Sequence, residues 1–347
     1  MVETDENKFM RRCIELASKA EGMTYPNPMV GSVIVCEDKI LGEGYHLRAG
    51  EVHAEVNAIN SVTDKSKLTS STLYVNLEPC SHFGKTPPCA DFIIANKIPR
   101  VVIGTIDSSD KVSGQGIKKL KDAGCEVKSG VLENECRSLN KRFFTFHEKK
   151  RPYIILKWAQ SADGFLDIER SEKQKPTRIT GKSERILVHK WRASEQTILV
   201  GAETIRADSP KLNVREWTGP DPLKLILSSS GNINTGSFVK STNNTSIVFT
   251  HNSGSYIPEA KKIVLKENVS SAIQISDYLY NAGYQSLFIE GGGKVLNHFI
   301  NEGLWDEARI FKGTEYFREG VTAPLISGIH VSKTVFSGSI LEIYLRH

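Results

Sequence analysis

Residues 53–89 read HAEVNAINSVTDKSKLTSSTLYVNLEPCSHFGKTPPC and contain the most informative side chains of the chain. They supply the imidazole of His53, the thiols of Cys80 and Cys89, and the carboxylate of Glu55. One imidazole and two thiolates can bind zinc and leave the fourth position of a tetrahedral site to water. A nearby carboxylate can then carry protons between that water and a leaving group. The stretch therefore predicts one catalytic Zn²⁺ per chain, with Glu55 as the proton shuttle.

The residues around this motif indicate an alternating α/β domain. A helical pattern over residues 51–61 begins with the His53–Glu55 triplet, and a strand-like run over 72–77 ends just before Cys80. Ligand sites in open α/β folds form at the carboxyl ends of strands. A further helical pattern begins at Cys89, and the partial positive charge of a helix N-terminus favours thiolate over thiol. A His-x-Glu triplet alone is common in proteins, so the order of all four residues carries the prediction.

The rest of the first domain continues the alternation of strands and helices. Such alternation predicts a largely parallel sheet with helices on both faces. The further predicted helices cover residues 9–20, 116–123 and 132–146, and the further predicted strands cover residues 30–36, 40–45, 100–106 and 125–129.

The length of 347 residues favours two domains. The polar stretch His147–Pro152 follows the last predicted helix of the first domain, so we expect domains over residues 1–147 and 148–347. The second domain is another α/β domain, of a size that suits dinucleotide binding. Its predicted strands cover residues 153–160, 197–200, 223–227, 246–250 and 286–290, and its predicted helices cover residues 183–193, 271–282 and 294–302.

Composition excludes several classes of protein. All six cysteines lie within the first 136 residues, which favours metal ligation over a disulfide framework in a reducing compartment. The polar N-terminus lacks the apolar core of a signal peptide, and the longest apolar runs are too short to span a bilayer. A net charge of +5 is small for this length and does not indicate a nucleic-acid-binding surface. We therefore expect a cytoplasmic protein with no nucleic-acid or membrane partner.

The spacing of the two cysteines distinguishes this chain from many zinc deaminases. The order of the motif resembles the cytidine deaminase superfamily, whose nucleobase deaminases have two residues between the cysteines. Eight residues, Ser81–Pro88, intervene here. This insertion contains an imidazole, an ammonium and a hydroxyl group, which suit a substrate phosphate. These groups belong to His82, Lys85 and Thr86.

Four segments together resemble the bifunctional riboflavin biosynthesis deaminase/reductase family: Thr24–Gly31, Gly44–His46, His53–Glu55 and Glu78–Cys89. The resemblance covers essentially the whole chain and is strongest across its first 90 residues. It implies an N-terminal cytidine deaminase-like α/β/α domain and a C-terminal dihydrofolate reductase-like α/β domain. It also implies deamination of 2,5-diamino-6-(5-phosphoribosylamino)pyrimidin-4-one, followed by NADPH-dependent reduction of the ribosyl chain to 5-amino-6-(5-phosphoribitylamino)uracil.

The resemblance also assigns residues around the deaminase substrate. It places Asn27 and His46 around the pyrimidine. From the residues alone, Asn27 could be a turn residue between two prolines, and His46 a packed loop histidine. The residues that match the family's substrate-phosphate region are Ser81, His82, Lys85 and Thr86.

In the second domain, the residues alone give weaker signals. Gly291–Gly293 follows a predicted strand and precedes a helix, which suits either a pyrophosphate or a structural turn. Two arginines at the predicted substrate positions suit a phosphate, although surface ion pairs are the simpler alternative. The proton donor stays open between Asp163 and Lys157. The resemblance places Ala159, Thr204, Asp208, Ser229, Gly292 and Gly293 at the cofactor, and Arg192, Leu212, Arg215 and Glu290 at the substrate.

Departures from the family pattern concern the reductase contacts. The family commonly has Trp where this chain has Arg178, residues 167–176 are more charged than usual, and residues 311–325 match the closing motif poorly. One alternative is a nucleic-acid base deaminase with an accessory nucleotide-binding domain. Another treats the second domain as a nucleotide-sensing or oligomerisation module. With the leading interpretation we expect a homo-oligomer that acts on a small phosphoribosyl pyrimidine.

Overall fold

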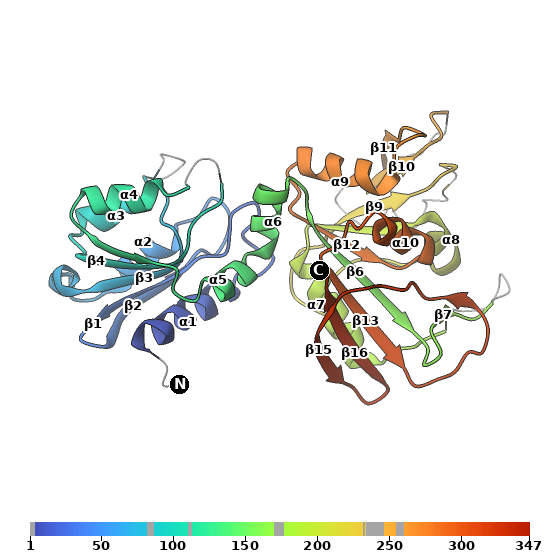
Figure 1. The fold of residues 1–347 in the computed structure, drawn as a ribbon, viewed down its shortest axis with the longest axis horizontal. Coiled ribbons are helices and arrows are strands. Elements are labelled where there is room, and N and C mark those ends of the chain that lie inside the picture. The colour runs from blue at the N-terminus through green and yellow to red at the C-terminus, as the bar shows by residue number, and fades with distance from the viewer. Residues whose placement is uncertain are drawn as a thin grey trace. The chain divides into compact units, whose positions relative to one another are not determined.

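The computed structural model describes residues 4–81, 87–109, 113–169, 177–231, 233, 246–254 and 260–347. The chain divides into two compact units, Met1–Lys150 and Arg151–His347, which Figure 1 shows. The boundary expected after His147 falls inside the last turn of helix α6 (Lys141–Lys149). The predicted phosphate-region residues His82, Lys85 and Thr86 lie outside the described residues.

The N-terminal unit has a mixed sheet between two layers of helices (Figure 1). Most predicted elements are confirmed within a few residues. In chain order the elements are α1 (Asp5–Ser18), β1 (Gly31–Cys36), β2 (Lys39–Tyr45), α2 (Ala54–Ser61), the 3-10 helix η1 (Lys65–Ser70), β3 (Thr72–Leu77), α3 (Cys89–Ala95), β4 (Arg100–Thr105), α4 (Gln115–Asp122), β5 (Glu126–Ser129), α5 (Glu133–Leu139) and α6.

The order of strands in this sheet is β2-β1-β3-β4-β5. Strand β1 is antiparallel to both β2 and β3, whereas β3, β4 and β5 are parallel. The prediction of a largely parallel sheet is therefore wrong for half of the strand pairs. The reason is the two-residue turn Glu37–Asp38, whose φ angles of 49° and 57° fold β1 and β2 into a hairpin. Parallel pairing begins only where α3 and α4 provide crossover connections.

Alternate residues of the strands face opposite layers of helices. On one face, Leu73 and Val101 belong to a buried cluster with residues of α2, α3 and α4. On the other face, Tyr74 and Val102 belong to a buried cluster with residues of α1 and α5. Because side chains alternate along a strand, this arrangement buries both faces of the sheet.

The predicted helix over residues 132–146 is two helices, which is a correction to the sequence interpretation. Asn140 ends α5 and precedes α6, with φ −102° and ψ 26°. Its side-chain oxygen accepts from the N–H of Met29 at 2.8 Å, and its Nδ2 donates to Met29 O at 2.8 Å. Both bonds reach a segment more than 100 residues away, so the periodicity of the sequence could not show the break.

The C-terminal unit is built on a nine-stranded sheet with the order β11-β10-β9-β8-β12-β6-β13-β16-β15. A short two-stranded sheet pairs β14 with β7. In chain order the elements are β6 (Tyr153–Gln160), β7 (Phe165–Asp167), α7 (Lys182–Ser194), β8 (Thr197–Gly201), α8 (Ala202–Asp208), β9 (Leu223–Leu227), β10 (Ser246–Thr250), β11 (Ala260–Val264), α9 (Ser271–Asn281), β12 (Ser286–Glu290), α10 (Gly293–Asn301), β13 (Glu307–Gly313), β14 (Val321–Thr322), β15 (Ile329–Val335) and β16 (Ser339–Leu345).

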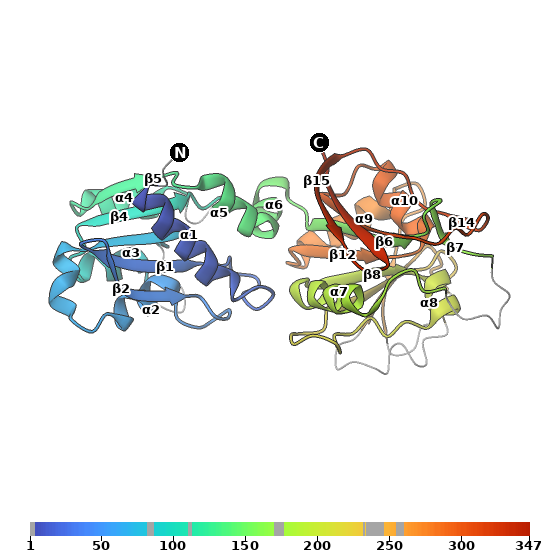
Figure 2. The same cartoon turned by 90° about the horizontal axis from the view of Figure 1, so that it is seen from below.

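Parallel pairing runs from β11 to β13, so the carboxyl ends of β9, β8, β12 and β6 meet at one edge of the sheet. Residues of α9 and α10 share a buried cluster on one face, and α7 and α8 pack on the other. The last strands, β16 and β15, add an antiparallel ribbon (Figure 1; Figure 2 shows β15 from below). Sequence reasoning did not identify this ribbon, although Ile329, Val331 and Val335 alternate with polar residues along β15; all seven residues of the strand are exposed.

We predict that Gly31→Ala destabilises the N-terminal unit by about 1–3 kcal/mol, the usual range for overpacking a core. A Cβ at Gly31 would overlap the carbonyl oxygen of Cys13, so α1 would have to move away from β1. Calorimetry of the full chain, which can resolve separate transitions of the two units, measures the effect.

The matched control is Gly338→Ala. No heavy atom lies within 4 Å of a Cβ at Gly338, so its effect should stay within about 0.5 kcal/mol. Equal unfolding temperatures for Gly31→Ala and the parent protein would contradict the close approach of α1 to β1.

Candidate active sites

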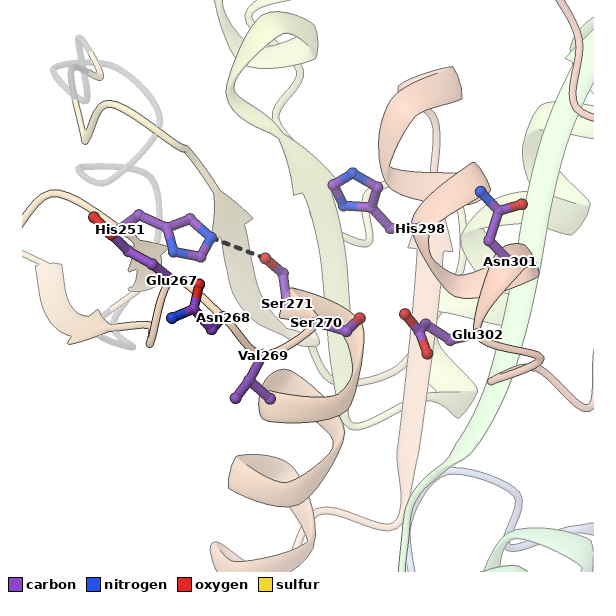
Figure 3. A pocket seen from close by; sticks show the side chains of 9 residues that line it. All are labelled: His251, Glu267, Asn268, Val269, Ser270, Ser271, His298, Asn301 and Glu302. Atoms are coloured by element: carbon purple, nitrogen blue, oxygen red, sulfur yellow. Dashed lines mark hydrogen bonds between the residues drawn. The ribbon is translucent and has the colours of Figure 1, made fainter.

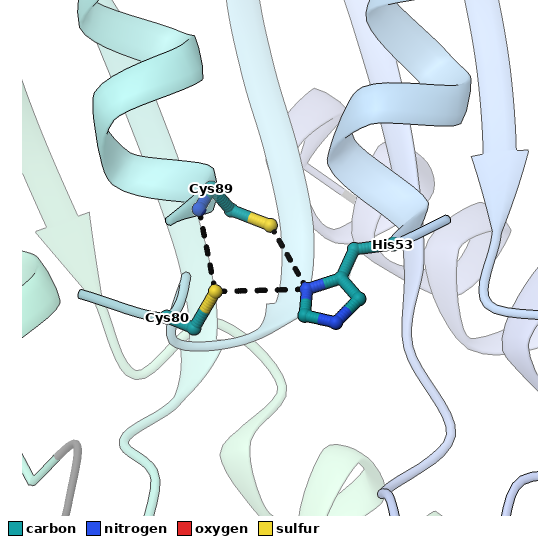
Figure 4. Close-up of side chains that lie close together, drawn as sticks. All are labelled: His53, Cys80 and Cys89. Atoms are coloured by element: carbon teal, nitrogen blue, oxygen red, sulfur yellow. Dashed lines mark hydrogen bonds between the residues drawn. The ribbon is translucent and has the colours of Figure 1, made fainter. Parts of the chain in front are cut away.

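Three predicted ligands meet in the N-terminal unit (Figure 4). The ligand atoms of His53, Cys80 and Cys89 all lie within 4.8 Å of one another. His53 Nδ1 is 3.1 Å from Cys89 Sγ and 3.6 Å from Cys80 Sγ. A tetrahedral zinc ion with ordinary Zn–N and Zn–S bonds requires a nitrogen–sulfur separation of about 3.6 Å. The donor set and its spacing therefore fit zinc with one position left open.

Local structure holds these ligands in place. His53 is the N-cap of α2, Cys80 follows β3 after two residues, and Cys89 is the first residue of α3. The backbone N–H of Cys89 donates to Cys80 Sγ at 3.3 Å. Hydrogen bonds from the Cys89 thiol and from His53 lower the pKa of Cys80 to about 4, although burial opposes them. Cys80 is thus ready to bind a metal as thiolate.

Glu55 lies in the first turn of α2 and is only 3% exposed. Burial, together with the negative charge of Cys80, raises the pKa of Glu55 to about 7. A carboxyl group with a pKa near neutrality can both take and release a proton at physiological pH. The environment of Glu55 therefore suits the predicted proton shuttle.

Glu78 has a structural role despite its place in the Glu-Pro-Cys motif. Its carboxylate accepts backbone hydrogen bonds from Gly114 and Gly116 at 2.9 Å and from Ile117 at 3.1 Å. These N–H groups open helix α4, so Glu78 fixes that helix beside the strand that leads to Cys80.

The structure brings the two predicted pyrimidine residues to the same place. Asn27 Nδ2 lies 3.1 Å from His46 Nε2, and the rings of His46 and His53 are 5.4 Å apart. His46 is buried, and burial lowers its pKa. Ser81 is half-buried and directly follows Cys80. Asn27, His46 and Ser81 thus surround the three ligands.

Most of the predicted cofactor residues follow or end parallel strands of the C-terminal sheet, or begin the helices that follow them. Gly292 has φ 78°, and a Cβ there would lie 3.1 Å from Thr204 Oγ1, so the glycine turn contacts the start of α8. The other members come from the ends of β6, α8 and β9 and from the start of α10. They are Ala159, Asp208, Ser229 and Gly293. Carboxyl ends of neighbouring parallel strands are where α/β sheets bind nucleotides.

A buried charge cluster lies at the same edge. Arg192 Nε and Nη2 each donate to the Glu290 carboxylate at 2.7 Å, and Lys157 Nζ lies 4.0 Å from Glu290 Oε2. Burial alone would raise the pKa of Glu290, but Arg192 and Lys157 outweigh it and lower that pKa. Burial lowers the pKa of Lys157, although Glu290 opposes it. The cluster holds an ionised carboxylate beside an ammonium of reduced pKa.

Two further predicted substrate residues differ in exposure. Leu212 is 3% exposed, has φ 50° and packs in the core beside Ile205 and Ile226. Arg215 is exposed, and its Nη1 donates to Asn213 Oδ1 at 3.1 Å. The Arg215 guanidinium is therefore accessible to solvent, whereas the Leu212 side chain fixes its loop to the core.

A separate hollow of about 510 Å³ lies between the loop after β10, the start of α9 and the C-terminal end of α10 (Figure 3). It contains none of the predicted site residues. The side chains that line it are His251, Glu267, Asn268, Val269, Ser270, Ser271, His298, Asn301 and Glu302.

Comparison with known proteins matches both units with known families. The family model of the cytidine and deoxycytidylate deaminase zinc-binding region matches residues 3–105, and that of the RibD C-terminal domain matches residues 152–317. The chain is 38% identical over 328 residues to the riboflavin biosynthesis protein RibD of Aquifex aeolicus, covering 93% of this chain and 90% of that protein. The chain belongs to the RibD family.

Other members of the RibD family agree in sequence and fold. The Escherichia coli RibD is 34% identical over 321 residues, covering 87% of this chain and 86% of that protein. A crystal structure of a diaminohydroxyphosphoribosylaminopyrimidine deaminase/5-amino-6-(5-phosphoribosylamino)uracil reductase from Thermotoga maritima is 35% identical, with a TM-score of 0.89 and 99% coverage of each chain.

Membership of the RibD family makes the chain a bifunctional deaminase and reductase of riboflavin biosynthesis. It acts on a small molecule and uses zinc and a nicotinamide cofactor. The alternative of a nucleic-acid base deaminase is replaced by this function, and the alternative of a non-enzymatic second domain is wrong. Among the described residues, no helix has both the length and the apolar character needed to cross a bilayer.

Sequence reasoning missed His189, a buried histidine of α7 whose Nδ1 accepts from the backbone N–H of Arg215 at 3.1 Å. Its position three residues before Arg192 places both side chains on one face of the helix. That spacing is the signal that could have identified it.

We predict that Cys89→Ser sharply lowers the zinc content of the purified protein, because a hydroxyl is a much poorer zinc ligand than a thiolate. Elemental analysis together with ammonia release measures the effect. The control is Cys36→Ser, since Cys36 lies at the end of β1 and its Sγ approaches Ser70 Oγ at 3.6 Å. Full zinc content in Cys89→Ser would show that this ligand assignment is wrong.

We predict that Glu290→Gln destabilises the C-terminal unit by about 3–5 kcal/mol at neutral pH, because Lys157 and Arg192 lose their buried counter-charge. The folded pKa of Glu290 is lowered, so its contribution is complete above the unfolded value of about 4.3 and is lost as the pH falls through the folded value. The difference between variant and parent should therefore shrink in acid.

Urea unfolding of both proteins between neutral and acidic pH measures this dependence. Glu203→Gln is the control, because Glu203 pairs with Lys294 on the exposed surface and should contribute less than about 1 kcal/mol. A pH-independent difference for Glu290→Gln would contradict an ionised carboxylate in the cluster.

Proposed function

We propose that the chain converts 2,5-diamino-6-(5-phosphoribosylamino)pyrimidin-4-one to 5-amino-6-(5-phosphoribitylamino)uracil in two steps. The N-terminal unit exchanges the ring amino group for an oxo group. The C-terminal unit then reduces the ribosyl chain with NADPH. The observation that carries the proposal is a buried Glu55 beside three clustered zinc ligands, in a chain whose second unit belongs to a reductase family.

In the deamination step, His53, Cys80 and Cys89 hold one zinc ion per chain. Zinc supplies a Lewis acid that makes water a stronger acid and a better nucleophile at neutral pH. Glu55 takes a proton from the attacking water and returns it to the departing amine, so that water and the amino group become an oxo group and ammonia. Its burial in the first turn of α2, two residues after the ligand His53, places Glu55 for both transfers.

Substrate orientation in this step is proposed for the residues around the ligands. Asn27 and His46 contact the pyrimidine, and their mutual contact fixes the direction of both side chains. Ser81 contributes to the phosphate end of the site. We extend the phosphate end to His82, Lys85 and Thr86 on the family resemblance alone.

In the reduction step, a bound NADPH would supply the hydride that reduces C1′ of the opened ribosyl chain, and the attached nitrogen would take a proton. We propose Lys157 as the proton donor, because burial lowers its pKa and Glu290 holds it in place. Asp163 is less suited. Its carboxylate accepts from Ser161 Oγ at 2.6 Å and from the backbone N–H groups of Phe317 and Arg318, so it organises a loop.

The cofactor is proposed to lie across the edge formed by β6, β8, β9 and β12. The turn at Gly292 and Gly293 receives the pyrophosphate at the start of α10, where backbone N–H groups and the helix dipole favour anions. Ala159, Thr204, Asp208 and Ser229 complete the site.

The substrate is proposed to bind beside this edge. Glu290 contacts the ribosyl end, Leu212 supports the loop, and Arg215 offers its exposed guanidinium to the phosphate. Arg192 acts through Glu290 and Asn213, because all three of its guanidinium nitrogens donate to these residues. The family departures at Arg178 and residues 311–325 stay without a proposed role. A cytoplasmic homo-oligomer without nucleic-acid partners stays our expectation.

We predict that Glu55→Gln lowers ammonia release by at least about 100-fold while zinc content stays at the parental level, because the amide cannot carry the proton. The same variant should oxidise NADPH at the parental rate when it is given the deaminated substrate. Coupled assays of ammonia and NADPH, with elemental analysis for zinc, measure all three quantities.

Two outcomes would contradict the proposal. Parental ammonia release by Glu55→Gln would remove Glu55 from the chemistry. Failure of the parent protein to oxidise NADPH with the deaminated substrate would exclude the second step.

A further inference from the structure

Three side chains of α7 hold the loop that precedes β9. Arg185, His189 and Arg192 are four and then three residues apart, so they lie along one stripe of the helix. Arg185 Nε is 2.8 Å from both carboxylate oxygens of Glu216. His189 Nδ1 accepts from the N–H of Arg215 at 3.1 Å, and Arg192 Nη1 donates to Asn213 O at 3.2 Å. Residues 213–216 of the loop therefore run antiparallel to α7. Asn213, Arg215 and Glu216 each make a polar contact with the helix.

The same loop is anchored at both ends. Leu212 is buried in the core with φ 50°, so the chain turns sharply just before Asn213. At the other end, a Cβ at Gly219 would lie 2.6 Å from Ala193 Cβ of the same helix. The backbone at Arg215 is therefore restrained on both sides, while the Arg215 side chain is exposed.

His189 is the centre of this arrangement and is only 1% exposed. An imidazole can accept at Nδ1 only while that nitrogen is unprotonated. Burial, together with the positive charges of Arg192 and Arg215, lowers the pKa of His189 to about 4, against the opposing effects of Glu216 and Glu290. The ring is therefore neutral at physiological pH and can hold the Arg215 backbone.

The stripe also reaches the buried charge cluster. Arg192 donates two hydrogen bonds to Glu290 and one to Asn213, so one side chain joins the proposed proton site to the loop. Arg192 uses three of its five N–H donors on Glu290 and Asn213, and its side chain is largely buried, so Arg215 is the member of the arginine pair with an exposed side chain for an anion.

We infer that His189 is a positioning residue for the reductase: by holding the Arg215 backbone, it directs the guanidinium to the substrate phosphate and sets the preference for phosphorylated over dephosphorylated substrate. This inference rests on the proposed function, in which Arg215 binds that phosphate. His189 touches neither reacting atom, so it acts on the affinity for one end of the substrate.

The test compares His189→Leu with His189→Asn in the full chain. Leucine has no acceptor, whereas Asn Oδ1 can take the place of Nδ1. NADPH oxidation is measured with the deaminated phosphoribosyl substrate and with its dephosphorylated form. For His189→Leu we expect about a ten-fold rise in KM for the phosphorylated substrate, the size expected when a part-buried N–H loses its acceptor. The kcat and the KM for the dephosphorylated form should stay at parental values, and His189→Asn should recover most of the loss.

Several outcomes would overturn the inference. An equal rise in KM for both substrates, or a fall in kcat with unchanged KM, would show a general structural role. Failure of His189→Asn to improve on His189→Leu would exclude the acceptor. If His189→Leu does not fold, Arg185→Gln tests the same stripe and should raise only the KM for the phosphorylated substrate. Lys182→Gln, at an exposed position of α7, is the matched control.

Arg215→Ala separates this inference from the proposed function. A parental KM for the phosphorylated substrate in Arg215→Ala would show that the proposed phosphate contact is wrong. A raised KM in Arg215→Ala with a parental KM in His189→Leu would overturn the positioning role alone.

Discussion

The predicted ligand atoms of His53, Cys80 and Cys89 lie within 4.8 Å of one another, and this proximity constrains the N-terminal unit. They come from the start of α2, the segment after β3 and the start of α3, so those three elements cannot move independently. Gly44 permits the close approach of β2 to α2, since a Cβ there would overlap the backbone of Ala58. Glu78 ties the segment after β3 to α4 through backbone N–H groups. The elements around the site therefore fix the positions of one imidazole and two thiols relative to one another.

The C-terminal unit organises its site by a different interaction, a buried network of charges. Glu290 and Lys157 are neighbours across β12 and β6, and both side chains are largely buried. Arg192 reaches the Glu290 carboxylate from α7. Arg309 of β13 pairs with Glu307 on its own strand at 2.6 Å. Removing one member of such a network leaves another charge buried without its partner, so the network specifies one arrangement of strands and helix. Arg309 adds to this by stacking 4.5 Å from the ring of Trp191.

The two units show how far sequence patterns lead. The clustering of His53, Cys80 and Cys89 was predictable because residue type restricts metal ligation strongly and the motif spans only 37 residues, 53–89. Strands such as β6 and β12 were predictable with their bounds, since buried strands of a parallel sheet read as continuous apolar runs. The break at Asn140 was not, because its cause is a contact with a distant segment. The ribbon of β16 and β15 was also missed, although its two strands are close in sequence.

The sequence by itself determined the family and the two α/β units, and it predicted the zinc ligands and the carboxylate beside them, because these depend on residue types at short spacing. Only the tertiary structure decided the order of strands in the mixed sheet. It also showed that the carboxylates of Glu78 and Asp163 accept backbone hydrogen bonds and so have structural roles. It also decided that Arg192 pairs with Glu290 while Arg215 stays exposed. The physical reason is that hydrogen bonding and burial, which separate a structural carboxylate from a reactive one, are properties of the folded environment.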